Sequence, residues 1–156
     1  MRRRRASKRE VLTDPKYNSP IIGRFVNIVM YDGKKTIAQR IVYEAFNMVQ
    51  ERAKQDPVKI FFEALENARP RLAVRPRRIG GATYQVPVEV PKERGFFIAL
   101  RWLRDFARNK KGRQMSEKLA DEILLAYKNE GAVIKKKDDT HKMAESNRAF
   151  AHFRFR

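Results

Sequence analysis

The chain has 156 residues and a formal net charge of +18, because 36 lysines and arginines stand against 18 aspartates and glutamates. Its length is that of one domain with a substantial core. It contains no cysteine, which excludes disulfides and cysteine-ligated metals, and no apolar run approaches the ~18 residues of a membrane helix. We therefore expect a single domain, residues 1–156, with no membrane partner.

The positive charge is concentrated in four stretches, residues 1–9, 69–88, 92–113 and 135–156, while the rest of the chain is slightly acidic. Patches of this kind are typical of a surface that binds nucleic acid. Uniformly spread charge would instead indicate a protein kept soluble by repulsion.

Residues 1–18 predict a basic N-terminal arm. Like charges repel here and nothing apolar is available to pack, so the arm should order only when a polyanion neutralises it. No apolar segment follows the arginines, so the stretch is not a secretory signal. The arginines proposed to contact RNA are Arg2, Arg3, Arg4 and Arg5.

Three helices are predicted between the arm and residue 70. Ser19 and Pro20 provide a cap and a first turn, a second helix opens near Thr36, and a third runs from Pro57 until Pro70 stops it. Lys34 and Lys35 lie at the turn before the second helix, where they can contact phosphate. The buried stripe expected for the second helix is Ile37, Ile41, Val42, Ala45, Phe46, Val49 and Ala53.

Residues 72–90 predict a β-hairpin arm, with strands at 72–78 and 83–90. Gly80 and Gly81 can both take positive φ, as a two-residue hairpin turn requires. This turn places Arg77 opposite Tyr84, and Arg75 opposite Val86. The prolines at 76 and 87 interrupt the ladder, so the hairpin should be a ribbon with two edges.

Two interpretations of the hairpin stay open. It folds back on its own domain, or it reaches into an anionic partner, where Tyr84 stacks and arginines contact phosphate. The arginines concerned are Arg71, Arg75, Arg77 and Arg78. A lone ribbon is marginal in water and needs support from another element.

The predicted fourth helix, from Pro91 to about Asn109, has opposite apolar and basic sides. Ordinary solvated faces mix charges of both signs, whereas this stripe holds only basic residues, with Phe97 among them. The basic residues are Arg94, Arg101, Arg104, Arg108 and Lys111. We interpret them as an RNA-binding surface; a plain solvated face is the alternative.

A fifth helix is predicted from Ser116 to Gly131, and a last one from about Asp138 to Ala149. The C-terminal tail, residues 148–156, interleaves phenylalanines with arginines, which suits stacking on bases; the alternative is that its phenylalanines complete the core. Further candidates for RNA contact are Lys135, Lys136, Arg148 and Arg154.

The elements together predict a mainly α fold, a bundle of five or six helices with one protruding β-hairpin inserted between helices three and four. We see no catalytic constellation, since neither His141 nor His152 has a partner at metal-ligand spacing. Asp138, Asp139 and Glu145 could hold a nuclease metal, but helix capping explains them better. We expect no enzyme activity and no cofactor.

Five stretches of the chain carry motifs of a known family. They are DPKY at 14–17, FVNIVMYDGKK at 25–35, RPRRIGGATYQVPVEVP at 75–91, ALRWL at 99–103 and GAVIKKKDDTHKMAESNRAFAHFRF at 131–155. They span nearly the whole chain, which resembles the small-subunit ribosomal protein seven family in its bacterial form.

The resemblance implies a structural protein that binds the three-prime major domain of small-subunit ribosomal RNA and nucleates assembly of the head. It implies a cytoplasmic protein in the small ribosomal subunit, monomeric outside it, that contacts neighbouring head and platform proteins. The hairpin would lie near exit-site transfer RNA and the messenger exit channel, with messenger RNA as a further candidate partner. On the hairpin, the resemblance adds Gly80 and Gly81 to the arginines and Tyr84.

Two rival hypotheses come from other classes. A DNA-bending architectural protein also combines basic helices with ribbon arms, and Ile79 at the hairpin tip could act as its wedge. A nuclease would need an acid–base cluster that the sequence lacks. The nucleic acid that co-purifies at moderate salt distinguishes all three.

Overall fold

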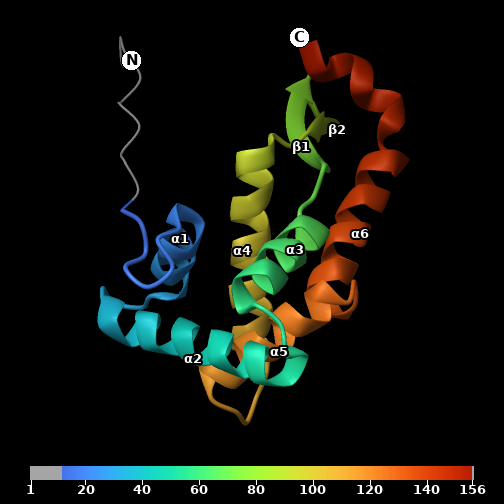
Figure 1. Cartoon of the computed structure of the whole chain (residues 1–156). Helices are drawn as coiled ribbons and strands as arrows, with labels where there is room; N and C mark the ends of the chain where they lie inside the picture. The colour runs from blue at the N-terminus through green and yellow to red at the C-terminus, as the bar shows by residue number, and fades with distance from the viewer. Residues whose placement is uncertain (1–11, 156) are drawn as a thin grey trace.

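The computed structural model describes residues 12–155 and shows a helical body with one β-hairpin and a short helix at the C-terminal end (Figure 1). The elements are α1 Pro20–Val29, α2 Lys35–Ala53, α3 Pro57–Ala68, β1 Leu72–Ile79, β2 Ala82–Glu89, α4 Lys92–Asn109, α5 Met115–Tyr127, α6 Gly131–Ser146 and the 3₁₀ helix η1 Arg148–Phe155. The mainly α class, and the hairpin between the third and fourth helices, are confirmed. No helix in the described part of the chain has the length and apolar character to cross a membrane.

The core is built around α5, which packs against α2, α3 and α4. Its Leu119 and Ile123 are fully buried. Three phenylalanines from α1, α2 and α3 meet beside it: Phe61 lies 5.1 Å, centroid to centroid, from both Phe25 and Phe46. Each such side chain contributes about 1.5–3 kcal/mol when removed from water, so this cluster holds the first three helices together.

Local signals explain where the helices begin. Asp56 caps α3, since its Oδ1 accepts a hydrogen bond from the Val58 N–H at 3.0 Å. Ser19 occupies the N-cap position of α1, as predicted, but its side chain makes no capping hydrogen bond. One position in α2 was predicted wrongly: Ile37 is 48% exposed and Ala38 faces the core instead. The stripe is centred on positions 38, 42, 45, 46 and 49, which leaves Ile37 at its edge.

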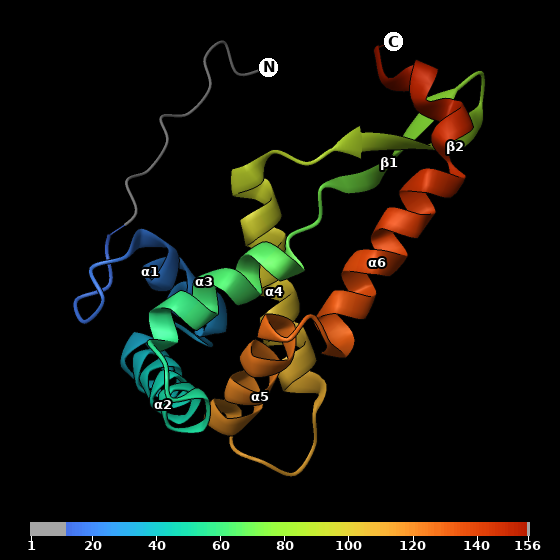
Figure 2. The same ribbon diagram turned by 45° about the vertical axis from the view of Figure 1, so that its right-hand side comes forward.

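The hairpin has the predicted register. Arg77 pairs with Tyr84, and Arg75 with Val86, while Gly80 and Gly81 turn the chain at φ of 57° and 91°. Both figures show the ribbon projecting from the helical body with α6 and η1 beside it (Figures 1 and 2). Val86 is accordingly buried, at 1% exposure. The support that a two-stranded ribbon needs comes from the C-terminal end of the chain.

The prediction for the last helix was wrong at both ends. The helix α6 begins at Gly131, not near Asp138, and ends at Ser146, after which η1 carries the chain onward. Val133 and Ile134 in its first turn are buried. The lysines at 135–137 suggested a loop, but the buried pair just before them decides the helix, and Lys137 donates to the Asn67 carbonyl at 2.9 Å.

Residues 12–18, expected to belong to a free arm, pack on the helical body. Asp14 is buried, and its carboxylate accepts hydrogen bonds from the Tyr43 hydroxyl at 2.8 Å and from the N–H groups of Lys16 and Tyr17, both at 3.1 Å. Burial, together with the bond to Asp14, raises the pKa of Tyr43 to about 12. Residues 1–11, with the four arginines of the arm, lie outside the described residues.

Candidate nucleic-acid interface

The C-terminal half of α4 lies against the end of α1 and the loop that follows it. Arg104 donates from Nη1 to the Ile28 carbonyl at 3.4 Å, and Arg108 donates from Nη2 to the Val29 carbonyl at 3.1 Å. The last carbonyls of a helix lack partners within it, so these arginines cap α1 from outside. Two of the residues that we interpreted as RNA-binding, Arg104 and Arg108, therefore also have a structural role.

The loop between α1 and α2 presents two lysines next to those arginines. Asp32 and Gly33 take positive φ, 48° and 74°, and the Lys34 N–H returns to the Tyr31 carbonyl at 3.0 Å. Lys34 and Lys35 are exposed at the first turn of α2. The helix dipole adds positive potential there. Residues far apart in the chain, 28–35 and 94–111, thus form one surface.

We call this surface the basic face. Its members are the exposed or half-exposed cations of the α1–α2 loop and the first residue of α2, of the outer side of α4, and of the segment just after α4. They are Lys34, Lys35, Arg94, Arg101, Arg104, Arg108 and Lys111. Asp105 pairs with Arg104 at 2.6 Å, so the face is strongly but not purely basic.

One aromatic side chain stands exposed on the basic face. Tyr31 is 70% exposed, and the Arg108 guanidinium lies 5.9 Å from its ring centroid. An exposed aromatic ring among cations is suited to stacking on a nucleic-acid base. The prediction from sequence did not single out Tyr31, although the spacing of α1 places it just beyond the buried stripe.

The hairpin carries a second basic region. Arg71, Arg75 and Arg78 are exposed, while Arg77 is half-buried and donates from Nη1 to the Phe153 carbonyl at 2.9 Å. Three of the four predicted arginines are thus free to meet a partner. The glycines at the tip add no side chain, so the backbone there can approach a partner closely.

The Tyr84 ring is partly buried by the C-terminal end of the chain. Its ring packs against Phe150 at 5.2 Å and Phe153 at 5.4 Å between centroids. The η1 helix folds over the ribbon and pairs the three rings with one another, whereas stacking of these rings on RNA bases stays a prediction. The spacing of Phe150 and Phe153, three residues apart, was the signal for one apolar helix side.

The base of the hairpin is tied to α6 by a histidine that sequence reasoning left without a role. The Arg71 N–H donates to Nε2 of His141 at 2.9 Å. Burial, and then the nearby Lys137, lower the pKa of His141 below its ordinary 6.5, which favours the neutral ring that can accept this bond. In the same C-terminal segment, the predicted RNA-contacting residues Lys135, Lys136 and Arg148 are exposed. The side chain of Arg154 lies outside the described residues.

Comparison with known proteins identifies the family. A family model described as ribosomal protein S7p/S5e matches residues 1–148. The chain is 58% identical to small ribosomal subunit protein uS7 of Thermotoga maritima over 155 residues, which cover 99% of this chain and 100% of the relative. The proteins of the same name from Fervidobacterium nodosum and Thermodesulfovibrio yellowstonii are 57% and 55% identical, over 99% of this chain and 100% and 99% of theirs.

The chain belongs to the ribosomal protein S7p/S5e family. The resemblance inferred from the five sequence motifs is thereby confirmed over nearly the whole chain. Membership identifies the chain as a structural ribosomal protein. Among residues 12–155, no group of three or more His, Asp or Glu side chains is placed to hold a metal ion.

Lys34, Lys35 and the outer arginines of α4 belong to one surface, although they come from separate parts of the chain. The hydrogen bonds of Arg104 and Arg108 to α1 fix the positions of the two parts of that surface relative to each other.

Proposed function

We propose that this chain is a structural constituent of the small ribosomal subunit that works in the cytoplasm and binds small-subunit ribosomal RNA through the basic face. One observation carries the proposal: Arg104 and Arg108 join α4 to the end of α1, and so bring Lys34 and Lys35 beside the arginines of α4. Phosphate contacts of this kind orient a protein on RNA without reading sequence.

The finer part of the proposal concerns which RNA is bound. The basic face and the hairpin arginines lie on different elements, and the hairpin projects away from the helical body (Figure 2). Two separated basic regions suit several RNA helices at a junction better than one smooth duplex. We infer a binding site in the three-prime major domain and a role in nucleating assembly of the head, with neighbouring head and platform proteins as further contacts.

The hairpin has a proposed role of its own. Arg75 and Arg78 are exposed near a turn formed by two glycines, and β1 has eight residues, which at about 3.3 Å each gives a reach of about 25 Å. We propose that this tip contacts exit-site transfer RNA beside the messenger exit channel, through backbone and sugar. Messenger RNA is a second candidate partner there. Outside the ribosome, the chain is proposed to be a monomer.

The test is binding of the full chain to a transcript of the three-prime major domain and to random duplex DNA at matched salt and magnesium. The transcript should bind more tightly, and log affinity should fall with log salt by about 0.7–0.9 per phosphate contact. Replacing Lys34 and Lys35 by glutamate should weaken binding and flatten that slope, while the exposed Lys59→Glu on α3 serves as control. Equal affinity for both nucleic acids would favour an architectural DNA-binding protein and overturn the proposal.

A further inference from the structure

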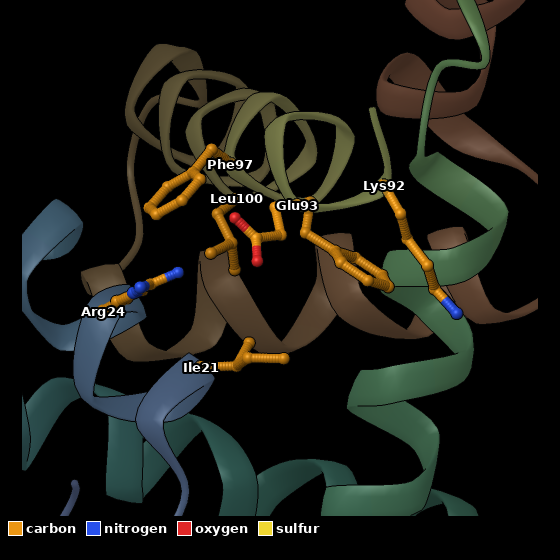
Figure 3. A pocket seen from close by; sticks show the side chains of 7 residues that line it. Ile21, Arg24, Lys92, Glu93, Phe97 and Leu100 are labelled. Carbon is orange, nitrogen blue, oxygen red and sulfur yellow. The ribbon is translucent and has the colours of Figure 1, made fainter. Parts of the chain in front are cut away.

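A small hollow lies between α1 and the first turns of α4, next to the basic face (Figure 3). Its volume is about 290 Å³, and its walls are mostly apolar. Ile21 contributes from α1, and Phe96, Phe97 and Leu100 contribute from α4. A hollow of this size is at the lower limit of ligand sites and has room for one flat ring system, but not for a folded segment.

Two groups of opposite charge face each other across the hollow. Figure 3 shows the Arg24 guanidinium and the Glu93 carboxylate turned toward each other from opposite helices. No ion pair joins them within the described residues. The Arg24 guanidinium lies 4.7 Å from the Phe97 ring centroid, which fixes its position, and its buried Nε has no hydrogen-bond acceptor. The hollow thus offers a donor and an acceptor on either side of an apolar floor.

The surroundings indicate the charge of the partner. Lys92 lines the hollow itself, and Arg94 and Arg101 line the adjoining hollow of about 450 Å³, which shares Glu93 and Phe97 with the first. A rim of three cations suits a ligand that carries phosphate. An apolar slot with a cationic rim is how proteins take up a base whose phosphates lie outside.

We propose that this hollow holds one unpaired purine base of the bound RNA, and that guanine is the best match. Arginine donates to the O6 and N7 acceptors of guanine. The Glu93 carboxylate would accept from the N1–H and the exocyclic amine on the adjoining Watson–Crick edge, while the apolar side chains that line the hollow would cover the faces of the ring. The inference rests on the proposed function, since it adds a base-reading site to a face that otherwise contacts phosphate.

Two interpretations of this site, an effect of overall charge and recognition of a base, predict opposite changes in RNA affinity when Glu93 is removed. If only overall charge matters, Glu93→Ala removes a repulsive carboxylate and should raise affinity for the three-prime major domain transcript. If Glu93 accepts hydrogen bonds from a base, the same change should lower affinity roughly tenfold. Glu63→Ala is the matched control, because Glu63 is exposed on α3 and lines neither hollow. A rise in affinity for Glu93→Ala equal to that of the control would overturn the proposal.

A second variant fills the hollow without changing charge. Ile21→Trp should leave circular dichroism and the salt slope unchanged, while a guanine protected from kethoxal by the wild-type chain becomes reactive. Arg24→Lys keeps the charge but removes Nε, and should lose the same protection. If the wild-type chain prefers the transcript but the footprint is unchanged in both variants, the base site is rejected and the proposed function stands.

The outcomes also separate this inference from the function on which it depends. A wild-type chain with no preference for the transcript would overturn the proposed function first. Variants that bind RNA normally but fail to recruit neighbouring head proteins during reconstitution would identify the hollow as a protein-docking site, and the proposal of a base would then be wrong.

Discussion

Arg77 of β1 donates a hydrogen bond to the main-chain carbonyl of Phe153 in η1, at 2.9 Å, and so ties the hairpin to the C-terminal end of the chain. Its cross-strand neighbour Tyr84 packs on the Phe150 and Phe153 rings at the same place. The hairpin and η1 therefore form one unit, in which a predicted RNA-contacting arginine has become a structural residue.

This unit can be tested by comparing two arginines of the same strand. Arg77→Ala should release η1, because it removes a charge-assisted hydrogen bond that typically contributes about 1.5–3 kcal/mol. Hydrogen exchange at residues 148–153 should then accelerate, with little change in global unfolding. Arg75→Ala is the control: it is exposed, and should weaken RNA binding while leaving that exchange slow. Equal exchange in both variants would show that the aromatic contacts alone hold η1.

Two arginines of the basic face should likewise differ, one with a structural role and one without. Arg108→Glu should lower the free energy of unfolding by about 1 kcal/mol, since it removes the cap on the Val29 carbonyl and the side chain is exposed. Arg101→Glu should leave unfolding unchanged, because none of the described hydrogen bonds or ion pairs involves Arg101. Both should weaken RNA binding. The measurement is urea unfolding alongside filter binding, and an equal loss of stability in both variants would contradict the assignment.

A pH dependence follows from His141. Its pKa is lowered in the fold by burial and Lys137, whereas Asp138 and Glu145 act in the opposite direction. The unfolded chain binds this proton more readily than the folded chain. The contribution of neutral His141 to the free energy of unfolding is therefore complete above about pH 6.5, and it is lost as the pH falls from there toward the lowered pKa. The urea midpoint should therefore rise between pH 5 and 7. His141→Gln keeps an acceptor for the Arg71 N–H without titrating, and should flatten that rise; an identical pH profile in both proteins would exclude His141 as the cause.

Excision of the hairpin tests whether it only contacts partners or also belongs to the core of the fold. Val86 is buried, but by α6 and η1 and outside the main helical cluster. Replacing residues 73–89 with a short Gly-Ser link should leave the body cooperatively folded. It should also expose Phe150 and Phe153, so the shortened chain is expected to self-associate.

Removing residues 148–156 from the excised chain should restore monomers, as measured by size exclusion, because the two phenylalanines leave with them. On reconstituted ribosomes, both shortened chains should enter the subunit but retain exit-site transfer RNA poorly. Normal retention would limit the hairpin to ribosomal RNA, and loss of cooperative unfolding would show that the ribbon belongs to the core.

Much of the fold was predictable because its signals are local. The spacing of Ile22, Phe25 and Val29 marks a helix face, and two glycines in succession permit only a few turn types, so the pairing of Arg77 with Tyr84 followed by counting. The start of α6 was missed because Lys135, Lys136 and Lys137 outweighed the two buried residues before them. Short apolar pairs are weak evidence for a helix until a neighbouring element is known to cover them.

The sequence by itself determined the helical class, the place and register of the hairpin, the family, and where basic side chains are concentrated. These depend on periodicity, on turn chemistry and on composition, which act over a few residues. Only the tertiary structure decided which cations are free. Arg77, Arg104, Arg108 and Lys137 each donate to a carbonyl at least 70 positions away in the chain, and the Tyr84 ring is covered by a helix that no local pattern connects to it. A side chain's charge is a local property, but its hydrogen-bond partner depends on which distant backbone the fold brings within about 3 Å.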